Sequence, residues 1–161
     1  MRHKAHPFTR TLAALALVGL ALPAVAQTQV TDAWARATVP HQQSTGAFMT
    51  LTADSDSKLI DVQSPVAEIV EVHQMTMDND VMGMKQVKSV DLPAGKAVSL
   101  DPSGYHVMLM KLHQQVKEGE QVPLTLVIED AKGQKQTLEI QAPVRALNAE
   151  AMSGHDHQHM H

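Results

Sequence analysis

Short hydrophobic or alternating runs recur between residues 30 and 144, and residues typical of turns separate them. The separators include Pro93-Ala94-Gly95, Pro102-Ser103-Gly104 and Lys132-Gly133. No segment of this region carries a long 3.6-residue period, so the pattern predicts an all-β fold, a β-sandwich or barrel. The nine predicted strands are residues 30–37, 46–53, 58–62, 69–77, 82–87, 97–100, 106–112, 122–129 and 136–144.

The two ends of the chain do not follow this pattern. Residues 1–26 have a basic start, an apolar run over residues 12–22 and the small-residue site Ala24-Val25-Ala26, which together predict a secretory signal peptide. The apolar run is about half of the ~20 residues that a spanning helix needs, so we expect the cleaved chain not to span a membrane. Residues 27–148 are the predicted folded domain, and residues 149–161 are predicted to be a disordered tail rich in His and Met.

Composition excludes several classes of function. The 161 residues contain no cysteine, which removes disulfides, thiol nucleophiles, Cys-ligated zinc and the thiolate of a blue-copper electron carrier. Signal cleavage leaves 10 basic and 17 acidic residues, a formal net charge of −7, so nucleic-acid binding is not expected. Neither a phosphate loop nor a Ser/His/Asp signature is present, and we expect a protein that is not an enzyme.

Histidine and methionine are abundant, with ten of each. Strand alternation places Glu71 and His73 on one face of residues 69–77, together with Met75 and Met77. If Asp78-Asn79 forms a two-residue loop, His73 lies opposite Met84 and Met75 lies opposite Met82. His106, Met108 and Met110 likewise share a face of residues 106–112, and we expect Met110 and Met49 to pack in the core. Met75, Met77 and Met82 are either accessory sulfur ligands or packing residues.

The combination of imidazole and thioether points to a particular kind of metal. Thioether sulfur is a soft ligand that favours Cu(I) over Zn²⁺, Mg²⁺ or Ca²⁺. Zinc sites use Cys, His and carboxylates instead. Alternating tail histidines can chelate a borderline ion such as Cu(II). The tail residues concerned are Met152, His155, His157, His159, Met160 and His161.

The spacing His-x10-Met-x21-His-x-Met of His73, Met84, His106 and Met108 resembles the motif of the periplasmic copper chaperones called PCu(A)C. The similarity extends to residues 32–36, 46–51, 104–110 and 117–126, while Gln74 departs from the Met that many members carry after the first His. The resemblance implies a cupredoxin-like Greek-key β-sandwich in the periplasm whose four motif residues bind one Cu(I). It further implies delivery to the copper subunit of cytochrome c oxidase, at its Cu-A centre, together with Sco-type copper proteins.

Two other functions stay open on the sequence. A copper scavenging or resistance protein without a dedicated acceptor would carry the same ligands. A metal-free structural β-sandwich would use the same strands and would show no affinity for Cu(I).

Overall fold

The computed structural model describes residues 27–148 as ten strands, and no helix occurs within that range. None of the described residues therefore forms a helix that is long and apolar enough to cross a membrane. The predicted all-β fold is confirmed. The strands are β1 (Thr28–Arg36), β2 (Ser44–Ala53), β3 (Ser57–Gln63), β4 (Ala67–Asp78), β5 (Val81–Val87), β6 (Val90–Leu92), β7 (Ala97–Leu100), β8 (Tyr105–Leu112), β9 (Gln121–Asp130) and β10 (Lys135–Arg145).

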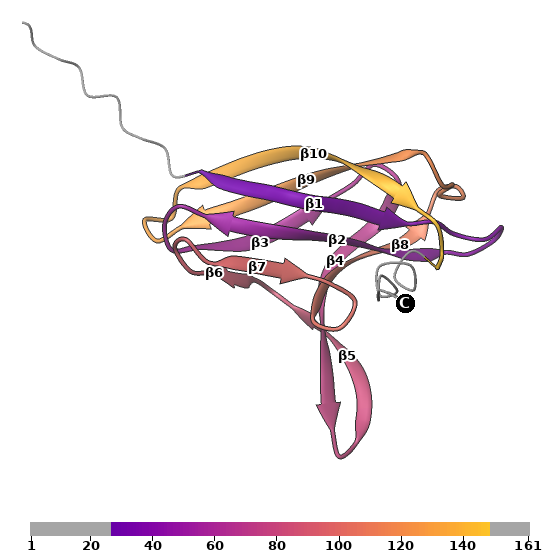
Figure 1. Cartoon of the computed structure of the whole chain (residues 1–161), viewed down its shortest axis with the longest axis horizontal. Helices are drawn as coiled ribbons and strands as arrows, with labels where there is room; N and C mark the ends of the chain where they lie inside the picture. The colour runs from indigo at the N-terminus through magenta and orange to yellow at the C-terminus, as the bar shows by residue number, and fades with distance from the viewer. Residues whose placement is uncertain (1–26, 149–161) are drawn as a thin grey trace, which may run out of the picture.

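The strands form one continuous sheet in the order β5-β4-β8-β7-β2-β1-β10-β9-β3-β6, and β8 also pairs with β2. Many neighbours are not consecutive in the chain, as in a Greek key, and most pairs are antiparallel. Both halves of the sheet contribute to one core, with Leu51 from β2, Leu109 from β8 and Leu126 from β9 all fully buried. The sheet is thus closed over itself as a sandwich (Figure 1).

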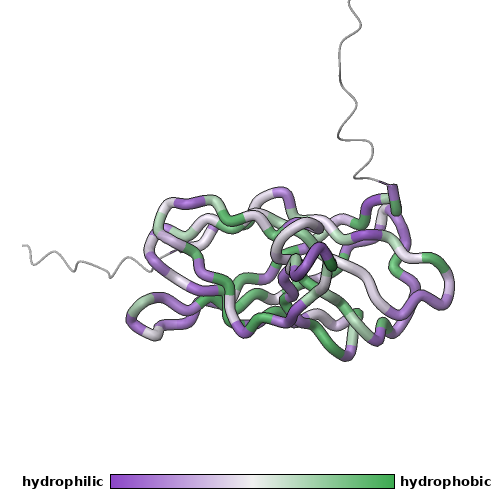
Figure 2. Tube along the Cα trace, turned by 90° about the horizontal axis from the view of Figure 1, so that it is seen from below, coloured by the Kyte–Doolittle hydropathy of each residue, from purple (hydrophilic) through white to green (hydrophobic). Residues whose placement is uncertain are grey.

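The core is aliphatic and follows from two-residue alternation. In β9, Val122, Leu124, Leu126 and Ile128 are at most 2% exposed, whereas the residues between them are only partly buried. Hydrophobic and hydrophilic residues accordingly alternate along much of the trace (Figure 2). Each fully buried Leu or Ile side chain contributes about 1.5–3 kcal/mol of transfer free energy. The many buried aliphatic side chains together stabilise the sandwich, which contains no cysteine to form a disulfide.

Nine of the ten strands correspond to the nine predicted segments, and β6 was missed. β6 has only three residues, too few for an alternating pattern to stand out. Its Val90 and Leu92 are nevertheless 1% and 0% exposed, because both side chains belong to the hydrophobic core.

The register of the β4–β5 hairpin differs from the prediction by two residues. Asn79 and Asp80, with φ of 48° and 64°, form the loop, and Asp78 pairs with Val81. Two positive φ values are what a type I′ hairpin turn requires, and Asn and Asp tolerate them. The pairing of His73 with Met84 and of Met75 with Met82 is therefore wrong. The observed pairs are Met75–Met84, Met77–Met82 and His73–Gln86.

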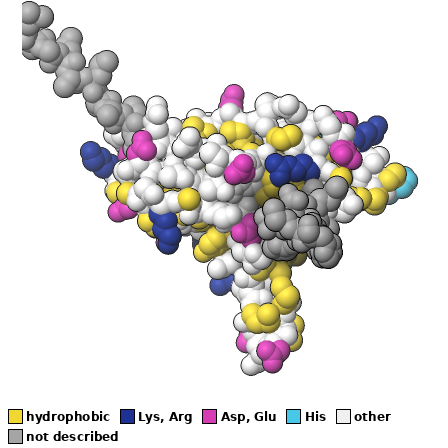
Figure 3. Space-filling model, viewed as in Figure 1, with side chains coloured by type: hydrophobic (Ala, Val, Ile, Leu, Met, Phe, Trp, Pro, Cys, Tyr) yellow, Lys and Arg dark blue, Asp and Glu magenta, His cyan; other side chains and the backbone are white. Residues whose placement is uncertain are grey.

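The shift by an even number of residues leaves Met84 on the face of β5 that was predicted. The hairpin itself extends away from the body of the sandwich (Figure 1). Its outer part exposes hydrophobic side chains: Met77 is 65% exposed, Val81 68% and Met82 63%. Figure 3 shows hydrophobic side chains along this protruding hairpin.

Candidate metal centre

Two adjacent strands, β4 and β8, supply the centre of the site. His73 lies directly opposite His106, and Glu71 lies directly opposite Met108. Such pairs have Cβ atoms about 4.5–5.5 Å apart. The intervening residues of β8, Val107 and Leu109, are fully buried in the core. Alternation thus places a square of two imidazoles, one carboxylate and one thioether on the face turned away from the core.

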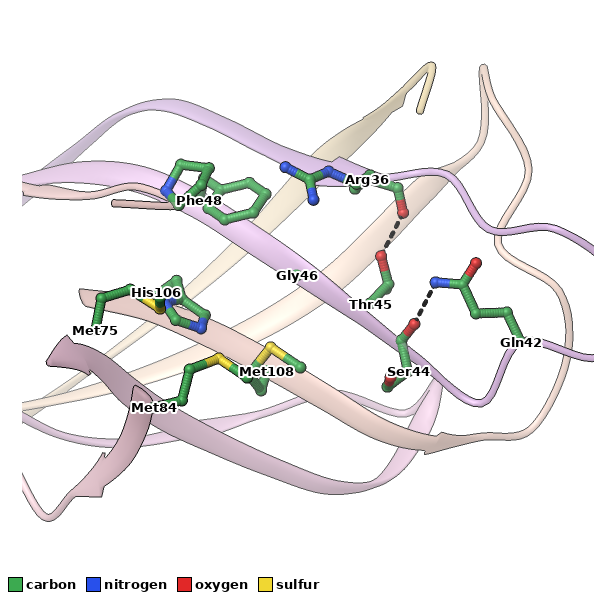
Figure 4. A pocket seen from close by; sticks show the side chains of 11 residues that line it. Arg36, Gln42, Ser44, Thr45, Gly46, Phe48, Met75, Met84, His106 and Met108 are labelled. Carbon is green, nitrogen blue, oxygen red and sulfur yellow. Dashed lines mark hydrogen bonds between the residues drawn. The ribbon is translucent and has the colours of Figure 1, made fainter. Parts of the chain in front are cut away.

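A cavity of about 280 Å³ opens beside this square. It brings together Met84, His106 and Met108, three of the four residues predicted as ligands, and also Met75 (Figure 4). Met75 reaches the cavity because it is the cross-strand partner of Met84. The remaining lining residues are Arg36, Gln42, Ser44, Thr45, Gly46, Phe48 and Pro102.

His73 does not line the cavity, but its ring lies next to it. The ring centroids of His73 and His106 are 6.1 Å apart and the rings meet edge to face. The His73 side chain is 15% exposed, and its Nε2 lies 2.8 Å from Oε2 of Glu71. Its other ring nitrogen, Nδ1, is buried and has no hydrogen-bond partner among the described residues.

His106 is held in one orientation by the loop that precedes β8. Its Nδ1 lies 3.3 Å from the carbonyl oxygen of Gly104, which also accepts a hydrogen bond from the Met75 N–H at 3.0 Å. Asp101 closes that loop by accepting hydrogen bonds from Ser103 and from the Gly104 N–H. With Nδ1–H donating to Gly104, the lone pair of Nε2 is left for another partner.

His106 is 5% exposed, and burial lowers the pKa of its imidazole. The nearby His73 and Arg36 lower this pKa further, while the Gly104 carbonyl and Asp101 act in the opposite direction. Hydrogen bonds from Ser103 in turn lower the pKa of Asp101, so its carboxylate keeps the loop closed. His106 is therefore neutral at neutral pH, which is the form of histidine that binds metals.

The wall of the cavity on β2 depends on a glycine. Gly46 is the partner of Met108, and a Cβ built on Gly46 would lie 2.6 Å from Cζ of Phe48. The Phe48 ring is 4% exposed, 4.5 Å from the Trp34 ring and 5.4 Å from the Arg36 guanidinium carbon. The Phe48 ring thus lies over Gly46, because no side chain occupies that position.

The outer methionines have separate positions. Met77 and Met82 oppose each other near the hairpin tip and do not line the cavity, whereas Met84 lines it and is 57% exposed. Met49 is buried as predicted, at 2% exposure. The expectation that Met110 lies in the core is wrong: Met110 is only partly buried, because it follows Met108 on the outer face of β8.

The donor set fits a soft cation. No group of three or more His, Asp or Glu side chains that could hold a metal ion is found among the described residues. The cavity instead offers neutral imidazole and thioethers, which suit Cu(I). The predicted tail ligands Met152, His155, His157, His159, Met160 and His161 lie outside the described residues.

Sequence reasoning left Glu71, Gly46 and Phe48 without a role in the site. Strand alternation did place Glu71 on the face of His73, which was the available signal. Gly46 and Phe48 belong to a segment that carried the family resemblance, but the folding of the ring over the glycine needs the structure.

Fold and site together define a cupredoxin-like domain in which His and Met side chains meet at one cavity. Residues 28–144 match the family described as "Putative lipoprotein LpqE-like", and the chain belongs to this family. A protein of Leifsonia xyli subsp. xyli (strain CTCB07), named "Putative lipoprotein Lxx21020", is 30% identical over 127 residues, covering 72% of this chain and 76% of that protein.

Solved structures of PCuAC domains share the fold, which confirms the resemblance to that family. The copper-bound PCuAC domain from PmoF2 is 25% identical, with a TM-score of 0.58, covering 74% of this chain and 92% of that one. The Cu(I) form of DR1885 from Deinococcus radiodurans is 34% identical, with a TM-score of 0.53, covering 79% and 81%. Its apo form is 30% identical, with a TM-score of 0.56, covering 91% and 97%.

Proposed function

We propose that this protein is a copper chaperone that carries one Cu(I), bound by His73, Met84, His106 and Met108. The observation that supports it best is the meeting of Met84, His106 and Met108 at one cavity, with His73 directly opposite His106. Copper is the cargo of such a protein, not a cofactor for chemistry. The relatives whose structures are named as copper-bound or Cu(I) forms support the same assignment.

The proposed ligands suit capture and release. His106 is neutral and buried, so it binds without first losing a proton at neutral pH. Met84 lies on the protruding hairpin and is 57% exposed. An acceptor can therefore replace an exposed thioether first, while the buried imidazole still holds the ion. Met75 is the favoured accessory sulfur ligand because it lines the cavity. Met77 and Met82 lie nearer the tip of the hairpin, where a copper ion would contact their thioethers as it enters or leaves the site.

The finer parts of the proposal rest on the family and on ligand chemistry. Delivery to the Cu-A centre of cytochrome c oxidase, in cooperation with Sco-type copper proteins, comes from the family resemblance. Export to the periplasm comes from the predicted signal peptide, and the lipoprotein names of the relatives support an envelope location. Capture of Cu(II) by the tail comes from its alternating histidines.

An anaerobic competition titration with a Cu(I) chelator tests the proposal. The chain from residue 27 and a version without residues 149–161 should both bind one Cu(I) tightly, and His106→Ala should weaken binding in both. The proposal is contradicted if either version binds no Cu(I), or if His106→Ala binds Cu(I) as tightly as the unchanged chain. Transfer of the bound copper to an oxidase copper subunit separates a chaperone from a scavenger, which keeps its metal.

A further inference from the structure

Each histidine of the site has one ring nitrogen engaged, and the engaged nitrogens differ. In His106, Nδ1 faces the Gly104 carbonyl at 3.3 Å, so Nε2 is available. In His73, Nε2 faces the Glu71 carboxylate at 2.8 Å, while Nδ1 is buried without a hydrogen-bond partner among the described residues. A buried polar atom without a partner is costly unless something binds it.

The neighbour of Nε2 decides which nitrogen of a neutral imidazole carries the proton. A carboxylate only accepts hydrogen bonds, so the His73 nitrogen that faces Glu71 must be the N–H donor. The lone pair then lies on Nδ1, the nitrogen without a protein partner. Histidines that bind metals very commonly donate their other N–H to a carboxylate or a carbonyl, which fixes both the tautomer and the ring orientation.

Glu71 has the position that such a role requires. It lies two residues before His73 on the same face of β4 and directly opposite Met108 on β8. Its side chain is 28% exposed, so its contact with His73 is partly shielded from water. It also brings a negative charge beside a site whose other donors, imidazole and thioether, are neutral.

We propose that Glu71 is a positioning residue: it holds His73 as the Nε2–H tautomer so that Nδ1 is the atom that binds Cu(I), while His106 binds through Nε2. This inference rests on the proposed function and adds to it a residue outside the family motif. The opposite arrangement, in which Glu71 holds His73 away from copper and competes with it for Nε2, predicts the reverse effect of removing Glu71.

The first test reads the tautomer in the metal-free chain. Nitrogen-15 NMR of the labelled chain from residue 27, at about pH 8 where histidine is neutral, identifies the protonated nitrogen of each imidazole. His73, assigned by the loss of its signals in His73→Gln, should carry its proton on Nε2 in the wild type. In Glu71→Ala it should show a mixture of the two tautomers. A wild-type His73 protonated mainly on Nδ1 overturns the inference.

The second test reads affinity, with less than one equivalent of Cu(I) in an anaerobic competition. Glu71→Ala should lower the affinity about 10–100-fold, the usual effect of losing such a partner. Glu71→Gln keeps a carbonyl oxygen that can accept from Nε2–H, so it should lose less. The matched control is Glu68→Gln on the same strand, whose carboxylate contacts Lys111 at 2.9 Å and not the site, and it should change nothing.

Unchanged or tighter binding by Glu71→Ala overturns the inference, since the carboxylate would then be idle or a competitor of copper. Failure of the wild-type chain to bind Cu(I) would instead contradict the proposed function. The tautomer of His73 in the metal-free chain is measured independently of that result, so the two failures are distinguishable.

Discussion

Replacing Gly46 with alanine places a methyl group where the ring of Phe48 already lies. The new Cβ would be 2.6 Å from Cζ of Phe48 and 3.3 Å from both ε carbons. The ring cannot swing away freely, because it is 4% exposed and packs against Trp34 at 4.5 Å. Either the ring or strand β2 must move, and Gly46 is the partner of Met108, so the wall of the cavity moves with it.

Two opposing effects set the size of the change. Inserting a methyl group into a packed site costs about 1–3 kcal/mol. Alanine in a strand is otherwise better than glycine by about 0.5–1 kcal/mol, because glycine loses more backbone entropy on folding. The expected net loss is about 0–2.5 kcal/mol in the free energy of unfolding, or up to roughly 10 °C in Tm at about 4 °C per kcal/mol.

Thermal unfolding of the metal-free chain, followed by circular dichroism, measures this loss. Gly83→Ala is the matched control: it lies in β5, where an added Cβ meets only the Thr76 hydroxyl at 3.3 Å, so it should be as stable as the wild type or up to about 1 kcal/mol more stable. Phe48→Leu should cost less in the Gly46→Ala background than in the wild type, because the clash is then relieved. A more stable Gly46→Ala, or strictly additive effects, would refute this reasoning.

Three further outcomes follow from burial and charge. Met108→Ala and Met110→Ala should both melt close to wild type, and only Met108→Ala should lose Cu(I) affinity. Leu109→Ala should lower the free energy of unfolding by about 2–5 kcal/mol, because Leu109 is fully buried. A larger melting shift for Met110→Ala than for Leu109→Ala would contradict this assignment of the two faces of β8. The pKa of His106 is lowered in the fold, so the unfolded chain binds its proton first as pH falls below about 6.5. The free energy of unfolding of the metal-free chain should therefore decrease from that pH down to the folded-state pKa, and His106→Gln should flatten this decrease in denaturant titrations at several pH values. Removing residues 149–161 should abolish most Cu(II) binding at neutral pH and leave Cu(I) binding nearly intact. Equal Cu(II) affinity with and without the tail, measured by calorimetry, would disprove the hypothesis that the tail binds Cu(II) and the folded site binds Cu(I).

Much of the fold was predictable because the core strands alternate strictly. Val122, Leu124, Leu126 and Ile128 point into the core at every second position, and turn residues mark the ends of most strands. The same alternation correctly placed His106 and Met108 on one face. Alternation states which residues share a face, but it does not state which face is buried. For that reason Met110 was predicted in the core, although Val107 and Leu109 form the core side of β8.

The register of the β4–β5 hairpin could not be predicted from the sequence, because several residues of its turn tolerate the same backbone conformation. Asp78, Asn79 and Asp80 all tolerate a positive φ, so the two-residue turn could begin at either of the first two. Both choices keep Met84 on the predicted face, but only the observed one makes Met75 its partner and brings Met75 to the cavity. The contact of Glu71 with His73 likewise depends on side-chain geometry that no spacing rule contains.

X-ray absorption at the copper edge, recorded on the Cu(I)-loaded chain without residues 149–161, tests the central claim most directly. Binding by His73, Met84, His106 and Met108 predicts a mixed first shell of imidazole nitrogen and thioether sulfur, two of each. The nitrogen contribution should fall in His106→Ala and the sulfur contribution in Met108→Ala. A shell of nitrogen and oxygen alone would contradict a soft His/Met site for Cu(I).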